Sequence, residues 1–121
     1  MDGIAPPSRT EVEARWIALT TGSATREAVH AWTLQWVEGE HATVTDPMVW
    51  SALLRLHGFD MTATPEAPNM IGHGGRGRYV HPDAHIAREL ACWRVACREY
   101  DADPTAWLQR TRDQAKRHRR P

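Results

Sequence analysis

The sequence predicts an all-α fold, a compact orthogonal bundle of four or five short helices with one long Gly/Pro-rich loop. Apolar residues recur at helical spacing in several segments, most of these segments begin with a capping signal, and no segment alternates convincingly like a strand. The chain has 121 residues, a length that suits one domain with a hydrophobic core. We therefore expect a single helical domain over residues 1–121, with residues 1–7 and 116–121 frayed.

The first two predicted helices have clear start and stop signals. Ser8 opens a capping box that Glu11 completes, and Gly22 supplies a left-handed stop. Thr25 caps the second helix, which Gly39 ends. Apolar side chains line one face of each helix, at Val12, Trp16 and Leu19 in the first and at Val29, Trp32, Trp36 and Val37 in the second.

The third predicted helix begins at Asp46-Pro47, with Asp46 as the N-cap and Pro47 at the first helical position. Gly58 ends it, and Phe59 can fold back against the last turn. Together with the other helices it places four tryptophans on apolar stripes. We expect all four in the core: Trp16, Trp32, Trp50 and Trp93.

Residues 60–79 are predicted to be a long irregular loop. This stretch contains Pro65, Pro68 and four glycines between positions 72 and 77, which exclude a regular helix. Unstructured loops of this length are uncommon in compact domains, and those that occur are often functional or disordered.

A fourth helix is predicted to start at Pro82 and a fifth at Asp103-Pro104. The fourth shows the strongest periodicity in the chain, a 4-3-4-3 spacing of Ile86, Leu90, Trp93, Cys97 and Tyr100. The fifth continues through Trp107 and Leu108 into the basic segment 116–120.

Charge is divided unevenly between the two halves of the chain, although the formal net charge is zero. Residues 1–66 carry nine acidic residues and four arginines, whereas residues 67–121 carry six acidic and eleven basic residues. Such asymmetry indicates two binding faces, one charged tail, or attraction between the halves within the fold.

Two features indicate a cytoplasmic protein. The N-terminal residues have neither the basic nor the apolar part of a signal peptide, and no apolar run has membrane-spanning length. Cys92 and Cys97 lie five positions apart on one predicted helix and point in different directions, so we expect two buried free thiols rather than a disulfide.

The sequence contains no recognisable catalytic motif, so we do not expect an enzyme. His81 and His85 have the four-residue spacing of metal ligands, but the H-E-x-x-H pattern is absent and His81 precedes Pro82. We therefore predict no metal site and no cofactor. A hydrolase or metal-dependent enzyme that uses His73, His81 and His85 is the least favoured of three hypotheses.

Basic residues in the second half of the chain make nucleic acid a candidate partner. They lie in the Gly-rich segment 72–78 and toward the C-terminus, at Arg76, Arg78, Arg110, Arg112, Lys116, Arg117, Arg119 and Arg120. A helix-turn-helix is conceivable from the second and third helices, but the third has Arg55 as its one basic residue besides His57. The alternative function is thus a small nucleic-acid-binding regulatory protein that uses the Arg-rich loop and tail.

Several segments carry a resemblance to a known group. They are Thr25-Arg-Glu-Ala-Val-His-Ala-Trp32, Trp36-Val37, the run from Asp46 to Asp60, and Tyr79-Val-His-Pro-Asp83 followed by a helix with Trp93. This pattern over residues 23–93 resembles small bacterial immunity proteins of polymorphic-toxin and contact-dependent inhibition systems. The chain departs from the group in its Gly/Arg loop at 72–78 and its basic fifth helix.

The resemblance implies a protein that binds a cognate toxin domain, with a nuclease as one candidate, and occludes its active site. Because nucleases have basic clefts, an acidic patch would make an effective plug. The acidic candidates lie on the segments that flank the second and third helices. They are Glu38, Glu40, Asp60 and Glu66, while Asp46 is assigned mainly to helix capping.

Overall fold

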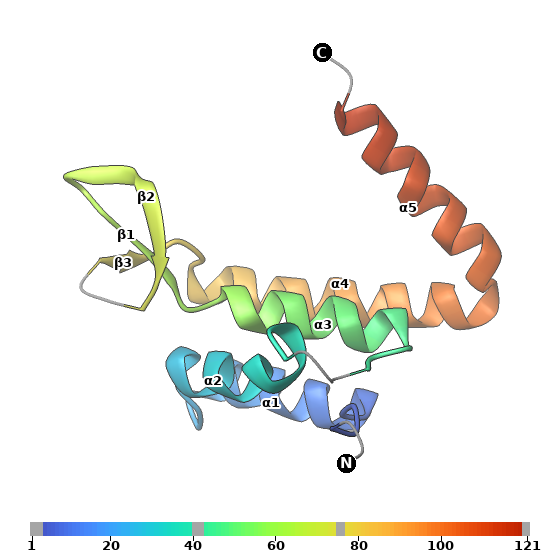
Figure 1. Cartoon of the computed structure of the whole chain (residues 1–121), viewed down its shortest axis with the longest axis horizontal. Helices are drawn as coiled ribbons and strands as arrows, with labels where there is room; N and C mark the ends of the chain where they lie inside the picture. Colours follow the sequence, from blue (N-terminus) through green and yellow to red (C-terminus); the bar gives the residue numbers. More distant parts are fainter. Residues whose placement is uncertain (1–3, 40–42, 75–76, 120–121) are drawn as a thin grey trace.

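The structure, a computed structural model, describes residues 4–39, 43–74 and 77–119. This part of the chain is mostly helical, as predicted, but it also contains a small antiparallel sheet, so the purely all-α prediction is wrong (Figure 1). The elements in chain order are α1 (Arg9–Thr21), α2 (Arg26–Val37), α3 (Pro47–Gly58), β1 (Met61–Thr64), β2 (Ala67–His73), β3 (Arg78–Tyr79), α4 (Asp83–Ala102) and α5 (Pro104–Arg119).

Four of the helices form the body of the molecule. α1 to α4 pack against one another, with α3 in contact with each of the other three (Figure 1). The sheet lies at one end of this body, and α5 turns away from the other end. The molecule therefore has two projections at opposite ends of a helical body.

Helix starts follow the predicted caps. The Glu11 backbone N–H donates to Ser8 Oγ at 3.0 Å, and the Ser8 N–H donates to the Glu11 carboxylate at 3.2 Å. The Thr25 and Asp46 side chains accept from backbone N–H groups of α2 and α3, and Gly22 has a φ of 78° at the end of α1. Two predicted ends are shifted by one or two residues, since α2 ends at Val37 and α3 includes Gly58.

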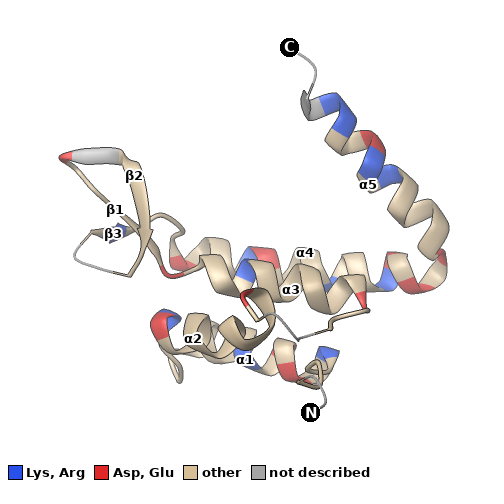
Figure 2. Ribbon diagram, viewed as in Figure 1, with Lys and Arg blue, Asp and Glu red and all other residues tan. Residues whose placement is uncertain are grey.

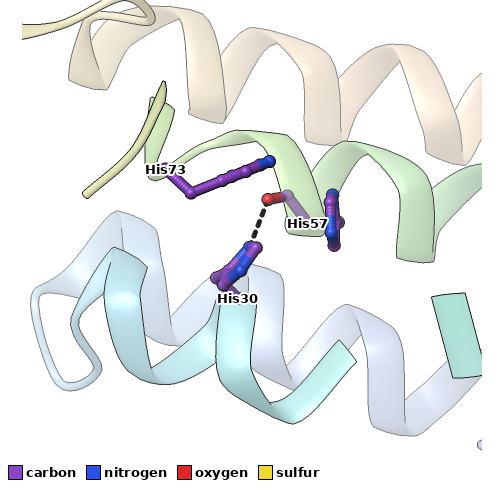
Figure 3. Close-up of side chains that lie close together, drawn as sticks. All are labelled: His30, His57 and His73. Atoms are coloured by element: carbon purple, nitrogen blue, oxygen red, sulfur yellow. Dashed lines mark hydrogen bonds between the residues drawn. The ribbon is translucent and has the colours of Figure 1, made fainter. Parts of the chain in front are cut away.

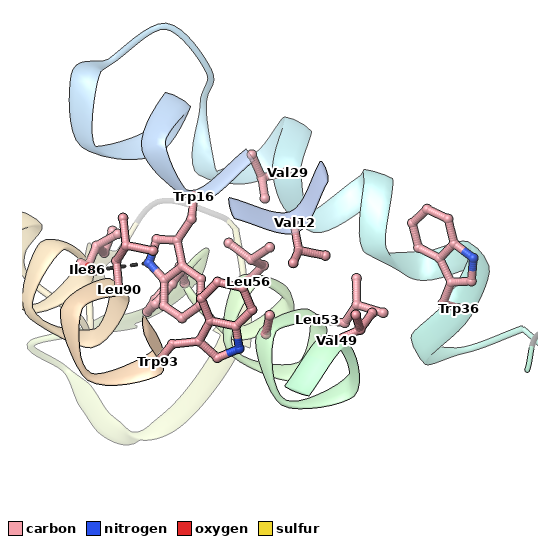
Figure 4. Close-up of a cluster of buried hydrophobic side chains, with 12 residues drawn as sticks. Val12, Trp16, Val29, Trp36, Val49, Leu53, Leu56, Ile86, Leu90 and Trp93 are labelled. Atoms are coloured by element: carbon pink, nitrogen blue, oxygen red, sulfur yellow. Dashed lines mark hydrogen bonds between the residues drawn. The ribbon is translucent and has the colours of Figure 1, made fainter. Parts of the chain in front are cut away.

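The core is built around two of the predicted tryptophans. Trp16 and Trp93 are buried with ring centroids 5.7 Å apart. Each indole N–H donates to a backbone carbonyl: Trp16 to Ile86 at 3.0 Å (Figure 4) and Trp93 to Met48 at 2.8 Å. These bonds satisfy the one polar group that burial of an indole would otherwise leave unpaired.

The other two tryptophans differ from the expectation. Trp32 is half-buried, and Trp50 is 37% exposed, so the prediction that Trp50 lies in the core is wrong. The buried face of α3 is formed by Met48, Val49, Ala52, Leu53 and Leu56. Trp50 and Leu54, one turn apart, lie outside this face and are both exposed.

The expectation of two buried thiols is also only partly met. Cys92 is exposed on α4, whereas Cys97 is half-buried and packs against the core. Burial raises the pKa of the Cys97 thiol, which disfavours the reactive thiolate.

Residues 60–79 form the sheet rather than the predicted loop, so that prediction is wrong. β1 is the central strand, paired antiparallel with β2 on one side and β3 on the other. Pro68 is compatible with this arrangement because β2 is an edge strand, where a missing N–H is tolerated. At Gly77 the chain passes so close to the Ala63 backbone that a Cβ would lie 2.5 Å from the Ala63 carbonyl oxygen.

The described residues near both ends of the chain have defined contacts or secondary structure. Pro7 is buried, and the Ala5 carbonyl accepts a hydrogen bond from Trp36 Nε1 at 2.9 Å, so residues 4–7 are not frayed. α5 continues to Arg119 instead of fraying from residue 116. None of the helices in the described segments combines the length and apolar character needed to cross a bilayer.

Candidate nucleic-acid interface

Positive charge is concentrated on α5 (Figure 2). This helix carries one acidic residue, Asp113, and five arginine or lysine residues: Arg110, Arg112, Lys116, Arg117 and Arg119. Residues 109–117 are all exposed, and within residues 104–117 burial is limited to the half-buried Ala106, Trp107 and Leu108. The second half of α5 is therefore a cationic helix surrounded by solvent.

Local contacts fix the corner between α4 and α5. Asp103 accepts from the Ala106 backbone N–H at 3.1 Å, as expected for the predicted cap. The Trp107 ring packs edge-on against Tyr100, with centroids 5.8 Å apart. Arg110 lies 3.7 Å from Glu99 across the same corner. These contacts hold the first turns of α5 against the end of α4.

Arg9 connects this corner to the rest of the body. Its Nε donates to Asp46 at 2.8 Å and its Nη1 donates to Asp101 at 2.7 Å. Burial of the Asp46 carboxyl opposes its ionisation, but the bonds from Arg9 and from backbone N–H groups of α3 outweigh it. The pKa of Asp46 therefore falls below its ordinary value. The same bonds to Asp46 and Asp101 raise the pKa of Arg9.

The cations of α5 differ from those of the first half of the chain in what they contact. Among the described residues, Arg112, Lys116 and Arg117 make no ion pair. The first-half arginines are engaged instead: Arg9, Arg26 and Arg55 pair with carboxylates, and Arg15 lies 4.7 Å from the ring centroid of Trp32. Arg78, Arg88 and Arg98 are also exposed and pair with no described carboxylate, but α5 is the element that groups three such cations.

The remaining basic candidates do not join this surface. Arg78 is exposed on β3, at the end of the molecule opposite α5 (Figure 1). Arg76 and Arg120 lie outside the described residues, as does the side chain of Arg119. The predicted set is therefore divided between two ends of the fold.

The three acidic candidates that the structure describes do not form a patch. Asp60 is 2% exposed and accepts from His73 Nδ1 at 2.6 Å, so its assignment to a partner-binding surface is wrong. Glu38 is exposed and accepts from His57 Nε2 at 3.1 Å. Glu66 is exposed in the turn between β1 and β2, and Glu40 lies outside the described residues.

The histidines assemble differently from the hypothesis that grouped His73 with His81 and His85. His81 and His85 stack on each other with centroids 4.9 Å apart. His73 instead lies beside His30 and His57, on α2 and α3 (Figure 3). The sequence did not suggest this group, because its members are far apart in the chain and show no ligand spacing. Their abundance, seven histidines in 121 residues, was the one available signal.

The fold and its charge distribution define a small, mostly helical protein with a projecting cationic helix. A family model described as YxzC DNA-binding protein matches residues 2–74, and the chain belongs to this family. No curated protein and no solved structure gives a significant match. The match spans α1 to β2, so α4 and α5 lie outside it.

This family membership corrects the resemblance to immunity proteins. The description of the matched family names DNA binding. Nothing in the comparisons points to polymorphic-toxin or contact-dependent inhibition systems. The immunity interpretation, with its toxin partner, is therefore wrong. The finding favours the alternative drawn from the basic residues, a nucleic-acid-binding protein.

Proposed function

We propose that this protein binds DNA through the phosphate backbone, that α5 supplies most of the contacts, and that it acts by binding without a catalytic step. The family description supports the choice of DNA as the partner. The single observation that carries the role of α5 is its group of three exposed cations that pair with no carboxylate in the described part of the chain, Arg112, Lys116 and Arg117.

The physical reason is the energetics of phosphate neutralisation. A cation already paired with a carboxylate must break that pair before it contacts phosphate, whereas an unpaired cation releases DNA counterions directly. Arg112 and Lys116 are four residues apart and so lie on one side of α5, and Arg117 is rotated about 100° around the helix from Lys116. A helix with cations on both flanks can contact phosphates on both sides of a groove.

The segment that matches the family is less suited to phosphate contact. Residues 1–66 contain nine acidic residues and four arginines. Three of these arginines pair with carboxylates, and the fourth lies over a tryptophan ring. α3 buries five residues in the body, and its connection from α2 is longer than the turn of a helix-turn-helix. We therefore assign to this segment the role of holding α4 and α5, in part through Arg9.

The test is binding of the full chain to a fluorescent duplex DNA, measured by anisotropy over a series of salt concentrations. Arg112→Gln/Arg117→Gln removes two exposed cations from α5. If both contact phosphate, the slope of log K against log[salt] becomes shallower by about 1.8.

A matched control removes the same charge elsewhere. Arg15→Gln/Arg88→Gln removes two exposed arginines from α1 and α4, and it is expected to leave the slope nearly unchanged. Equal losses in the two variants would mean that net charge alone governs binding, and the role of α5 would be rejected.

A further inference from the structure

Three imidazole rings converge where α2, the end of α3 and β2 meet (Figure 3). The ring centroids of His30, His57 and His73 are separated by 4.4 to 4.7 Å. One ring nitrogen of each lies within 4.8 Å of one from each of the others. Three imidazole nitrogens this close together are a donor set that suits a transition-metal ion.

Each ring also has one nitrogen bonded to an oxygen that can only accept. His30 Nδ1 donates to the His57 carbonyl at 2.7 Å, His73 Nδ1 to Asp60 at 2.6 Å, and His57 Nε2 to Glu38 at 3.1 Å. In a neutral imidazole, a donor at one nitrogen leaves a lone pair at the other. Hydrogen bonds of histidine to carboxylate and carbonyl oxygens are the usual support of metal-ligating histidines.

The surroundings supply negative charge and an entry route. Asp60 is almost fully buried, and its carboxylate also lies 3.3 Å from His30 Nδ1. The His30 and His57 side chains are 15% and 18% exposed, whereas that of His73 is 39% exposed. A buried carboxylate beside two of the three rings, with the His73 ring open to solvent, favours a cation that enters from the side of β2.

We propose that His30, His57 and His73 bind one divalent transition-metal ion of the zinc class, with Asp60 and Glu38 orienting the rings. Imidazole nitrogen suits this class of metal. Nitrogen ligands of tetrahedral zinc are roughly 3.3 Å apart, so binding draws the rings inward, and His73 on its exposed strand has room to move. Three protein ligands leave one position for water. The metal would fasten β2 to α2 and α3.

This proposal does not depend on DNA binding. All four residues, His30, His57, Asp60 and His73, lie within the family-matched segment, whereas the cations of α5 lie outside it. Loss of the metal would leave the charges of α5 unchanged, so the two proposals can fail separately.

The experiment uses the full chain without a histidine tag, with Zn²⁺ as the probe in calorimetry and thermal unfolding. We expect one Zn²⁺ per chain, and at about 100 times Kd a rise in Tm of roughly 10 °C. His73→Gln removes the most exposed ring and keeps an amide that can donate to Asp60, and it should weaken Zn²⁺ binding by at least about tenfold. His85→Gln alters the stacked pair of His81 and His85, and it should bind Zn²⁺ with the affinity of the unaltered chain.

Visible absorption of the Co²⁺-loaded chain provides a second measurement, which reports the ligands directly. A tetrahedral d–d spectrum that disappears in His73→Gln and persists in His85→Gln supports the proposal. Three outcomes would overturn it: no stoichiometric Zn²⁺ binding, unchanged affinity in His73→Gln, or an equal loss in His85→Gln.

Discussion

Arg9 Nη1 lies 2.7 Å from the Asp101 carboxylate, which links the first turn of α1 to the last turn of α4. The same guanidinium bonds to Asp46, the N-cap of α3. Arg9, which lies in the family-matched segment, thus binds the end of α4, and α5 projects from that end. The position of the cationic helix is therefore coupled to the body by a small number of polar contacts.

Replacement of Arg9 tests this link. Arg9→Gln removes both ion pairs and should lower the free energy of unfolding by about 1 kcal/mol, since the groups are partly exposed and screened. Asp101→Asn removes one of the two ion pairs and should lower the free energy of unfolding by a smaller amount. Urea unfolding followed by circular dichroism measures both. An equal loss in the two variants would show that the Asp46 contact contributes nothing.

Arg26 is the most buried arginine with described contacts, and its loss should be more costly. Its Nη1 donates to the Phe59 and His81 carbonyls, and its guanidinium lies 4.0 Å from the centroid of Tyr79. Arg26→Met leaves these carbonyls without their donor and should destabilise the protein by about 3 kcal/mol.

The charge partner of Arg26 provides the control. Asp83 is 98% exposed, so Asp83→Asn should have a much smaller effect on unfolding than Arg26→Met. If Asp83→Asn were the more damaging change, the ion pair rather than the carbonyl contacts would be the stabilising feature.

The backbone contact at Gly77 should tolerate no side chain. Gly77→Ala places a Cβ against the Ala63 backbone in β1 and should destabilise the sheet. Gly72→Ala, where a Cβ would meet nothing within 4 Å, is the matched control in the same sheet. Hydrogen exchange of β1 amides should increase only in Gly77→Ala. Equal exchange in both variants would refute the close approach.

His81 should make stability depend on pH. Burial, together with the charges of His85 and Arg26, lowers the pKa of His81 below its ordinary 6.5. The unfolded chain therefore takes up a proton first as pH falls through about 6.5, and this proton uptake destabilises the fold. Compared with the unaltered chain, His81→Gln should lose less stability between pH 7.5 and 5.5. An identical pH dependence in the two proteins would contradict this assignment.

Local signals explain which parts of the fold were predictable. Ser8, Thr25, Asp46 and Asp103 bond to backbone N–H groups within three residues of themselves, so the sequence alone located the helix starts. The sheet was missed because the Gly and Pro residues of 60–79 suggest a loop. Its pairing of Met61 with His73 depends on contacts between distant residues.

The candidate sites also divide into features that local sequence predicts and features that depend on contacts between distant residues. The cations of α5 could be listed from the sequence, but their exposure and their separation from Arg78 required the fold. Trp50 matched an apolar stripe, yet periodicity does not say how wide the buried face is. The three-histidine cluster joins positions 30, 57 and 73, which no short motif connects.

The most direct test of DNA binding through α5 compares the full chain with a chain that ends at residue 109, which retains Trp107 and Leu108 on the α4 corner. Both are titrated onto the same duplex DNA between 50 and 200 mM salt. We expect salt-sensitive binding by the full chain, and much weaker binding with a shallower salt dependence by the shortened chain, whose fold is checked by circular dichroism. Binding of the shortened chain with the same affinity and salt dependence would contradict it.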